Sequence, residues 1–201
     1  MPALLSYLAL GDSYSIGESV TEAGRWPTQL AAALRARGVA VAEPRFIAAT
    51  GWTTDELSAA MDAAEPLGAW DFVSLLIGVN NQYRGRDLAN YALEFTALLE
   101  RAIALAGHRP DRVLALSIPD WGATPFGQDC GRDAAVIAAE LDAYNAAAAA
   151  ACRTRGVAFV DITAASRAPG AGVADDRLHP CAAQYAQWAA LALPMADAQL
   201  A

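Results

Sequence analysis

The chain alternates short apolar runs with longer alanine-rich amphipathic segments. Apolar and β-branched residues are concentrated at 3–10, 39–48, 70–78, 112–118 and 157–163. These runs lack a strict apolar–polar alternation, which is typical of strands buried on both faces of a parallel sheet. The intervening segments have helical periodicity. We expect helices at 26–37, 54–64, 88–106, 133–155 and 182–193.

The repeated strand-then-helix order predicts an α/β protein with a central parallel sheet of about five strands, covered by helices on both faces. Connections are short and no segment has the composition of a linker, so we expect a single domain over residues 1–201. The alanine run at 146–151 fits a helix interior, since alanine is the best helix former. The stretch 164–179, rich in Gly, Pro and Asp, is the longest expected loop.

The charge of the chain narrows the function classes. Its formal net charge is −8, and its 14 basic residues are all arginine. Without lysine, the chain has no residue for Schiff-base chemistry or for a phosphate-binding loop of the Walker type. Acidity without a basic stripe argues against a nucleic-acid partner. The oligomeric state does not follow from the sequence.

The apolar runs are too short to span a bilayer, and the N-terminal run has no preceding basic residues of the kind found in a signal peptide. We therefore expect a cytoplasmic protein. The three cysteines, Cys130, Cys152 and Cys181, are odd in number and form no CxxC pair, which indicates reduced thiols.

A polar cluster follows each expected strand, and in a parallel sheet the carboxyl ends of the strands lie at one edge, where ligands bind. The clusters are GDSYS (11–15), TGWTT (50–54), GVNNQ (78–82), IPDWGATPF (118–126) and DDRLHP (175–180). The sequence therefore predicts a site assembled from loops at this edge.

Ser13 is the candidate nucleophile in this set, although a serine here also fits a polar turn that caps a helix. A serine needs a base, and the chain has two histidines. His108 follows a helix and precedes a strand, which places it at the opposite edge. His179 lies at the same edge as Ser13, with Asp176 three residues before it to orient the ring. Asp175 is the second choice for that role.

A serine that attacks a carbonyl group also requires donors for the negative charge that develops on the carbonyl oxygen. Candidates at this edge are the backbone N–H of Ser13, the backbone N–H of Gly51 and the side-chain amide of Asn80. Individually, Gly51 and Asn80 also fit ordinary turn residues. Their combination with Ser13 and His179 favours a catalytic interpretation.

These residues carry a resemblance to a known family. GDSYS, the glycine of ATGWTT, GVNN and the DxxH in DRLH occur in the order and positions found in the SGNH (GDSL) hydrolase superfamily, and the resemblance extends from Leu8 to about Pro180. It implies a flavodoxin-like three-layer α/β/α fold and hydrolysis of esters and related acyl compounds without a cofactor. By position, it assigns Ser13 as nucleophile, Asp176 and His179 as its triad partners, and Gly51 and Asn80 to the oxyanion hole.

The chain departs from the family pattern at two positions. Tyr14 replaces the leucine of the GDSL motif, and Asn81 stands where GxND has an aspartate. The segment SIPDWGATPFG resembles a stretch of small bacterial esterases of this family, which implies that Trp121 and Phe126 line an acyl pocket; packing beneath a loop explains the two aromatic residues equally well. Tyr14 is a further candidate for substrate binding.

Other catalytic patterns fit less well. Ser15 occupies the second glycine position of a GxSxG elbow, and GAGVAD at 170–175 lacks the third glycine of a dinucleotide-binding fingerprint. Once His179 is assigned to Ser13, no histidine cluster remains for zinc. The sequence thus predicts an esterase that works through an acyl-enzyme. Acyl transfer, deacetylation of a carbohydrate and a non-catalytic binding module of the same fold stay as alternatives.

Overall fold

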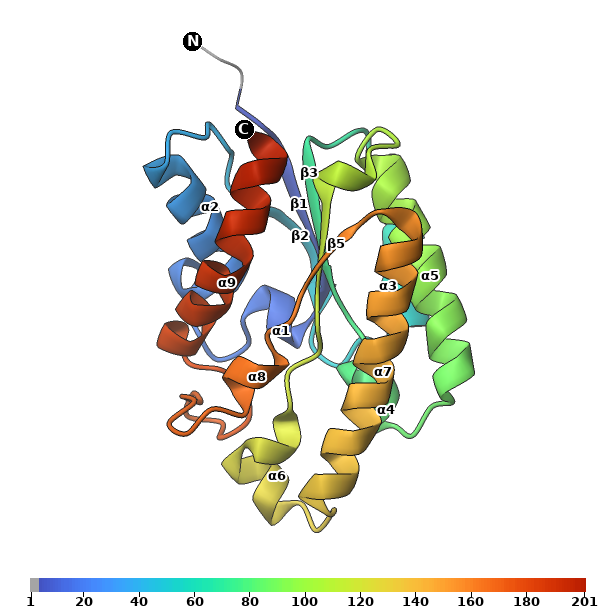
Figure 1. The fold of residues 1–201 in the computed structure, drawn as a ribbon, viewed down its shortest axis with the longest axis vertical. Coiled ribbons are helices and arrows are strands. Elements are labelled where there is room, and N and C mark those ends of the chain that lie inside the picture. Colours follow the sequence, from blue (N-terminus) through green and yellow to red (C-terminus); the bar gives the residue numbers. More distant parts are fainter. Residues whose placement is uncertain (1–3) are drawn as a thin grey trace.

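The computed structural model describes residues 4–201, which form a five-stranded sheet between two layers of helices (Figure 1). The strands are β1 (Tyr7–Asp12), β2 (Arg45–Ala49), β3 (Phe72–Leu76), β4 (Val113–Leu116) and β5 (Ala158–Val160). Their order in the sheet is β2-β1-β3-β4-β5, and every adjacent pair is parallel. This confirms the predicted parallel α/β sheet.

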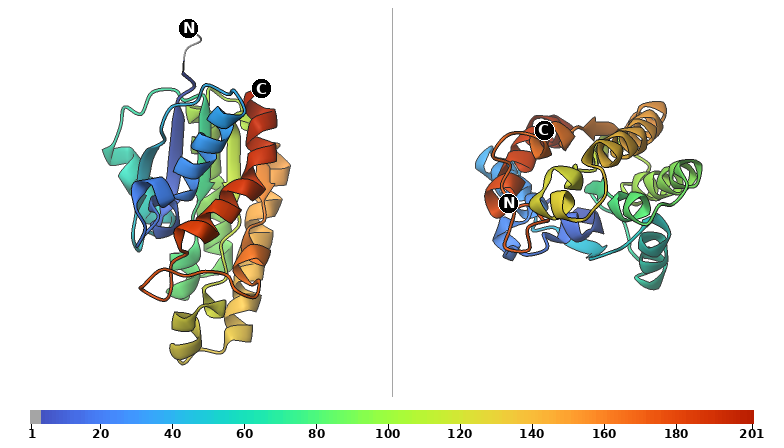
Figure 2. Two further views of the ribbon diagram at one scale, coloured as in Figure 1. Left: turned by 90° about the vertical axis from the view of Figure 1, so that its left-hand side faces the viewer. Right: turned by 90° about the horizontal axis from the view of Figure 1, so that it is seen from below.

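Five long helices cover the sheet: α2 (Trp26–Ala36), α3 (Thr54–Ala63), α5 (Leu88–Leu105), α7 (Ala134–Arg155) and α9 (Ala182–Leu200). Helices α2 and α9 pack together on one face, and α3, α5 and α7 lie on the other (Figures 1 and 2). The three-layer α/β/α architecture is therefore confirmed. None of the helices within residues 4–201 is both long and apolar enough to cross a membrane.

Short helices were not expected, and most of them lie at the carboxyl edge of the sheet. They are α1 (Ser13–Ile16), α4 (Val79–Tyr83), α6 (Pro125–Asp129) and α8 (Thr163–Ser166), with 3-10 turns at Glu22–Gly24, Pro110–Arg112 and Trp121–Ala123. With three to five residues each, they are too short for a helical period to show in the sequence. Helix α8 also occupies the start of the stretch expected to be an irregular loop.

Two predicted boundaries differ from the structure. Strand β2 begins only at Arg45, after Pro44, because a proline has no N–H to contribute to a ladder. The expected helix 182–193 continues through Pro194 to Leu200. Pro194 is exposed, whereas Trp188, Ala192, Ala196 and Leu200 form a buried stripe four residues apart. Packing of this stripe outweighs the hydrogen bond that the proline removes.

The central strands fix where the polar edge lies. All residues of β1, β3 and β4 are buried, and inside the sheet the Tyr7 hydroxyl is 3.0 Å from the Ser74 hydroxyl. Gly11 of β1 has no room for a side chain, since a Cβ there would lie 2.3 Å from the Leu76 carbonyl oxygen. The end of β1 is thus held tightly against β3, directly before Ser13.

Candidate active site

Ser13 is the first residue of α1, directly after the carboxyl end of β1. Asp12 caps this helix, because its Oδ1 accepts the backbone N–H of Tyr14 at 3.0 Å. Gly17 closes the helix with a φ of 63°, a left-handed conformation that glycine adopts without a steric penalty. Backbone N–H groups in the first turn of a helix have no intrahelical acceptor, so the N–H of Ser13 can serve an external anion.

The Ser13 hydroxyl contacts the imidazole of His179, which is 166 residues away in sequence. His179 Nε2 lies 2.9 Å from Ser13 Oγ, and Nδ1 of the same ring lies 2.6 Å from Oδ2 of Asp176. Both Ser13 and His179 are buried, with 4% and 8% of their surface exposed. A hydroxyl, an imidazole and a carboxylate are therefore hydrogen-bonded in series, the arrangement through which an imidazole can withdraw a proton from a hydroxyl.

The loop before α9 forms a tight turn around the Asp176 carboxylate. Asp176 Oδ1 accepts the backbone N–H groups of Leu178 and His179, both at 2.9 Å, and Arg177, between Asp176 and Leu178, has a φ of 66°. Oδ2 also accepts the hydroxyl of Ser19 at 2.7 Å. Partial burial raises the pKa of Asp176, but these hydrogen bonds outweigh it and lower the pKa to about 2. Asp176 is thus ionised at neutral pH.

The two competing candidates lie elsewhere. Asp175 is exposed, and it is Asp176 whose carboxylate contacts the ring of His179. His108 lies in the turn between α5 and β4, at the opposite edge of the sheet, with a φ of 60° and its N–H donated to the Ile103 carbonyl. Its position indicates a role in ending α5.

Gly51, in the loop after β2, and Asn80, in α4, belong to two neighbouring segments that are joined by hydrogen bonds. Gly51 follows β2 with a φ of 84°, and its carbonyl accepts Nη2 of Arg84 at 2.6 Å. Asn80, in α4, donates one amide hydrogen to the Trp52 carbonyl at 2.9 Å, which leaves the second hydrogen for another acceptor. Asn80 also lines the same cavity as Ser13 and His179.

Asn81, which departs from the family pattern, supports the neighbouring helix. Its Oδ1 accepts the backbone N–H of Thr54 at 3.1 Å, and its Nδ2 donates to the Thr54 hydroxyl at 2.6 Å. An amide can both accept and donate in this way, whereas the ionised carboxylate of an aspartate at this position would have no hydrogen to donate. Asn81 therefore fixes the start of α3, and its side chain is fully buried there.

A cavity of about 210 Å³ opens directly above the Ser13 hydroxyl. Its walls contain Tyr14, Trp121 and Phe126, the three aromatic residues that the sequence suggested for substrate binding. They also contain Tyr83 and Leu178, which the sequence analysis did not single out. The lining residues are Ser13, Tyr14, Val79, Asn80, Tyr83, Trp121, Phe126, Leu178 and His179. Most of this wall is apolar, which suits a hydrocarbon group beside polar reacting atoms.

The aromatic wall is held by specific contacts. The Trp121 indole donates Nε1–H to Oε1 of Gln82 at 2.8 Å, and its ring centroid lies 5.2 Å from Tyr83 and 6.2 Å from Phe126. The Tyr14 ring meets His179 edge-on, with centroids 5.4 Å apart. These packed contacts give the cavity fixed walls. Tyr83 is three residues after Asn80 on the same helix, and this spacing is the signal through which the sequence could have indicated it.

Asp12 is a second perturbed carboxyl beside the nucleophile. Its side chain is completely buried, and burial raises its pKa to about 7 despite hydrogen bonds from backbone N–H groups. Its Oδ2 has no hydrogen-bond partner among the described residues. Within residues 4–201, no group of three or more His, Cys, Asp or Glu side chains is arranged to hold a metal ion.

A hydroxyl, an imidazole and a carboxylate in series at the carboxyl edge of an α/β/α sheet are typical of hydrolases that attack acyl groups. Comparison with known families agrees with this class. The GDSL-like lipase/acylhydrolase family matches residues 9–187, and the chain belongs to this family of ester-hydrolysing enzymes. Comparison with curated protein sequences finds no significant match.

Solved structures of similar fold include several such enzymes. A lipase/acylhydrolase from Enterococcus faecalis superposes with a TM-score of 0.75 at 18% identity, over 98% of each chain. The acetylxylan esterase Axe2 from Geobacillus stearothermophilus gives 0.73 at 20% identity, over 96% of this chain and 94% of its own. TesA gives 0.72 at 18% identity, over 97% and 99% respectively. At these identities the likeness establishes the fold.

Proposed function

We propose that the chain is a single-domain, cofactor-independent serine hydrolase that cleaves carboxylic esters through an acyl-enzyme. Ser13 Oγ attacks the acyl carbonyl carbon while His179 Nε2 accepts the hydroxyl proton, and Asp176 stabilises the resulting imidazolium. The N–H groups of Ser13 and Gly51 and the Asn80 amide hold the oxyanion. His179 then protonates the leaving alcohol, and water repeats the sequence to release the acid.

The observation that carries this proposal is the hydrogen-bonded series Ser13–His179–Asp176 beneath an apolar cavity. The Ser13 Oγ–His179 Nε2 separation of 2.9 Å is within reach for direct proton transfer. The ionised Asp176 fixes Nδ1 of the ring as the protonated nitrogen, so Nε2 is free to accept the serine proton. A lone serine in a turn would require neither partner.

Replacing the nucleophile tests the proposal directly. Ser13→Ala should lower kcat for p-nitrophenyl acetate on the order of 10⁴–10⁶-fold while the circular dichroism spectrum is unchanged. A fluorophosphonate probe should label the wild type and not this variant. Ser15→Ala is the matched control: it removes a hydroxyl from the same helix, and that hydroxyl bonds the Leu10 carbonyl and not His179. An unchanged rate in Ser13→Ala would refute the assignment.

The alternative activities, acyl transfer and deacetylation of a carbohydrate, would use the same residues, and the reaction products distinguish them. Release of free acid from acyl esters of increasing length identifies an esterase, and transfer of the acyl group to an added alcohol identifies a transferase. Axe2, a neighbour in fold, is an acetylxylan esterase, so acetylated xylo-oligosaccharides belong in the panel. A wild-type protein that the fluorophosphonate does not label would instead favour a non-catalytic binding module.

A further inference from the structure

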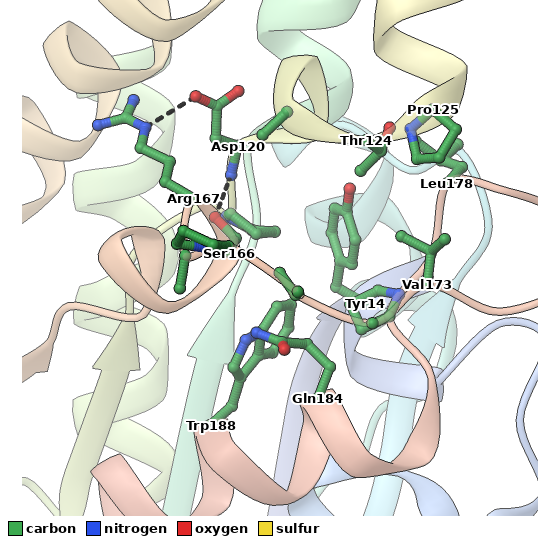
Figure 3. Close-up of a pocket in the computed structure, with 18 residues that line it drawn as sticks. Tyr14, Asp120, Thr124, Pro125, Ser166, Arg167, Val173, Leu178, Gln184 and Trp188 are labelled. Atoms are coloured by element: carbon green, nitrogen blue, oxygen red, sulfur yellow. Dashed lines mark hydrogen bonds and ion pairs between the residues drawn. The ribbon is translucent and has the colours of Figure 1, made fainter.

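A second cavity, of about 250 Å³, lies beside the first one at the same edge of the sheet. Figure 3 shows the residues that line it. Tyr14 and Leu178 line both cavities, so their side chains form the wall between them. The second cavity contains neither Ser13 nor His179. Its walls come from the 119–125 segment, the loop 166–173 and the start of α9. It is therefore placed to hold a part of the substrate remote from the reacting bond.

Two buried side chains in the wall of this cavity have polar atoms without a partner. Gln184 is 3% exposed and donates Nε2–H to the Ala165 carbonyl at 3.0 Å, and this bond leaves its Oε1 without a donor. Trp188 is completely buried, and its Nε1–H has no acceptor among the described residues. Figure 3 shows Gln184 and Trp188 together on one side of the cavity. Such atoms cost free energy when they stay unpaired.

One unpaired acceptor and one unpaired donor are complementary to a hydroxyl group. A hydroxyl donates its hydrogen to an oxygen such as Gln184 Oε1 and accepts an N–H such as that of Trp188. A hydrocarbon chain would leave both atoms unsatisfied. A carboxylate would satisfy the indole only and would repel the amide oxygen.

The charged groups of this cavity neutralise each other. Asp120 is 4% exposed, and its Oδ2 accepts Nε of Arg167 at 2.8 Å while its Oδ1 accepts the N–H of Gly122 at 2.9 Å. Arg167 also binds Oδ1 of Asp142 at 2.9 Å. Figure 3 shows the Asp120–Arg167 pair across the cavity from Tyr14. Among the residues that line the cavity, the carboxylate of Asp120 and the guanidinium of Arg167 balance each other, so the lining has no unpaired charge for an ionic ligand, which favours a neutral one.

We propose that the second cavity is a subsite for the alcohol part of the ester, and that it selects neutral, polyhydroxylated alcohols such as a polyol or a sugar. One hydroxyl of the alcohol carries the ester bond above Ser13, and another binds Gln184 and Trp188 beyond the Tyr14 wall. This inference rests on the proposed function, since it names the substrate class of the same site.

The subsite has a consequence for the acyl-enzyme that can be measured. In the reverse of the leaving step, a free hydroxyl of the alcohol loses its proton to His179 and its oxygen bonds to the acyl carbon. The bond between that carbon and Ser13 Oγ then breaks, and the proton returns from His179 to Ser13. A bound polyol therefore competes with water for the acyl group, whereas a simple alcohol gains nothing from the subsite.

The experiment forms the acetyl-enzyme from p-nitrophenyl acetate in the presence of glycerol or 1-propanol. The amounts of acetate, glyceryl acetate and propyl acetate then measure how the acetyl group is divided between water and each alcohol. Wild type should transfer to glycerol at least about tenfold better per mole than to 1-propanol. Gln184→Met should lower this preference about threefold to tenfold, the worth of one hydrogen bond. Trp188→Phe, which removes the indole N–H, should shift the preference in the same direction.

Gln199→Met is the matched control, because Gln199 lies on the same helix, donates Nε2–H to the Val113 carbonyl at 3.0 Å and also has an unpartnered Oε1, but does not line the cavity. It should keep the wild-type preference. Equal transfer to both alcohols by wild type, with p-nitrophenyl acetate still hydrolysed, would overturn the subsite and leave the proposed hydrolase intact. A wild type that does not hydrolyse p-nitrophenyl acetate would refute the proposed function itself.

Discussion

Ser19 and Asp176, 157 residues apart in sequence, are joined by a hydrogen bond of 2.7 Å to the carboxylate oxygen that also contacts the His179 ring. Ser19 has a φ of 65°, a conformation that costs an L-residue free energy. The loop after α1 thus holds the carboxylate that orients the base. Through this contact, the segment that carries the nucleophile also positions the third member of the series.

Removing the Ser19 hydroxyl should weaken catalysis without abolishing it. A typical hydrogen bond contributes about 0.5–1.5 kcal/mol net of exchange with water, and because the Ser19–Asp176 bond is exposed we expect a loss in this range, about threefold to tenfold in kcat. Ser19→Ala and Ser19→Gly both remove the hydroxyl, but glycine also relieves the positive φ. Steady-state kinetics should show the same loss of kcat in both variants. Urea denaturation should give Ser19→Gly a free energy of unfolding about 1 kcal/mol higher than that of Ser19→Ala. Wild-type kcat in both variants would contradict the role of Ser19.

Asn80→Ala should impair the chemical step more than substrate binding. The amide that donates to the Trp52 carbonyl has a second hydrogen available for the oxyanion, and this charge exists only as the reaction proceeds. We expect kcat to fall on the order of 10²–10³-fold with little change in KM. A change confined to KM would mean that Asn80 binds the ground state of the substrate.

Asp12 should make the protein less stable as the pH rises from about 4 to 7. Its folded pKa, raised by burial to about 7, lies above the ordinary value of 3.8, so the folded state binds more protons than the unfolded state in this range. Its contribution is full below pH 3.8 and declines with a slope of up to about 1.4 kcal/mol per pH unit. Urea denaturation of wild type and Asp12→Asn across this range measures the difference.

The asparagine variant keeps an oxygen to cap Tyr14 and does not titrate, so its stability relative to wild type should increase with pH. Asp176 does not interfere in this range. Its pKa is lowered to about 2, so its contribution is present above pH 3.8 and is lost only as the pH falls toward 2. Parallel stability curves for wild type and Asp12→Asn between pH 4 and 7 would contradict the prediction.

Gly11→Ala should destabilise the fold strongly, because the new Cβ would lie 2.3 Å from the Leu76 carbonyl oxygen and 2.1 Å from Ser15 Oγ. We expect a loss of about 3 kcal/mol or more in the free energy of unfolding. Gly68→Ala is the comparison: its φ is 70°, but no atom lies within 4 Å of the new Cβ, so it should cost about 1 kcal/mol. Equal losses in the two variants would mean that contact with β3 is not what requires glycine at position 11.

The parts of the fold that the sequence predicted are those with long, regular patterns. The five apolar runs each overlap a strand, and the five long amphipathic segments each overlap a helix. A strand buried on both faces leaves a continuous apolar run in the sequence, and a helix packed on one face leaves a helical period. The short helices α1, α4, α6 and α8 could not be predicted in this way. They are set by caps and tertiary contacts at the edge of the sheet, such as that of Asp12 with Tyr14.

The candidate site also contains residues that the sequence predicted and residues that it did not. The structure places Ser13, His179 and Asp176 together, and the rule that loops meet at the carboxyl edge of a parallel sheet anticipates this. The catalytic roles of these residues, and of Gly51 and Asn80, stay predictions, as does a cytoplasmic location. Ser19 and Leu178 escaped sequence reasoning because each depends on how the loop before α9 folds back on α1. Nothing in the local pattern around Ser19 signals a partner 157 residues away.

Helix α9 begins just after His179 and packs along α2, on the face of the sheet opposite α5 and α7. The position of His179 therefore depends on the packing of α9 against α2, whereas Ser13 directly follows strand β1 of the sheet. A displacement of α9 from α2 by heat or denaturant would move His179 away from Ser13 without breaking the pairing of the strands. Enzymatic activity should therefore respond to displacement of α9, and on heating or in denaturant it should be lost before the spectroscopic signal of the strands.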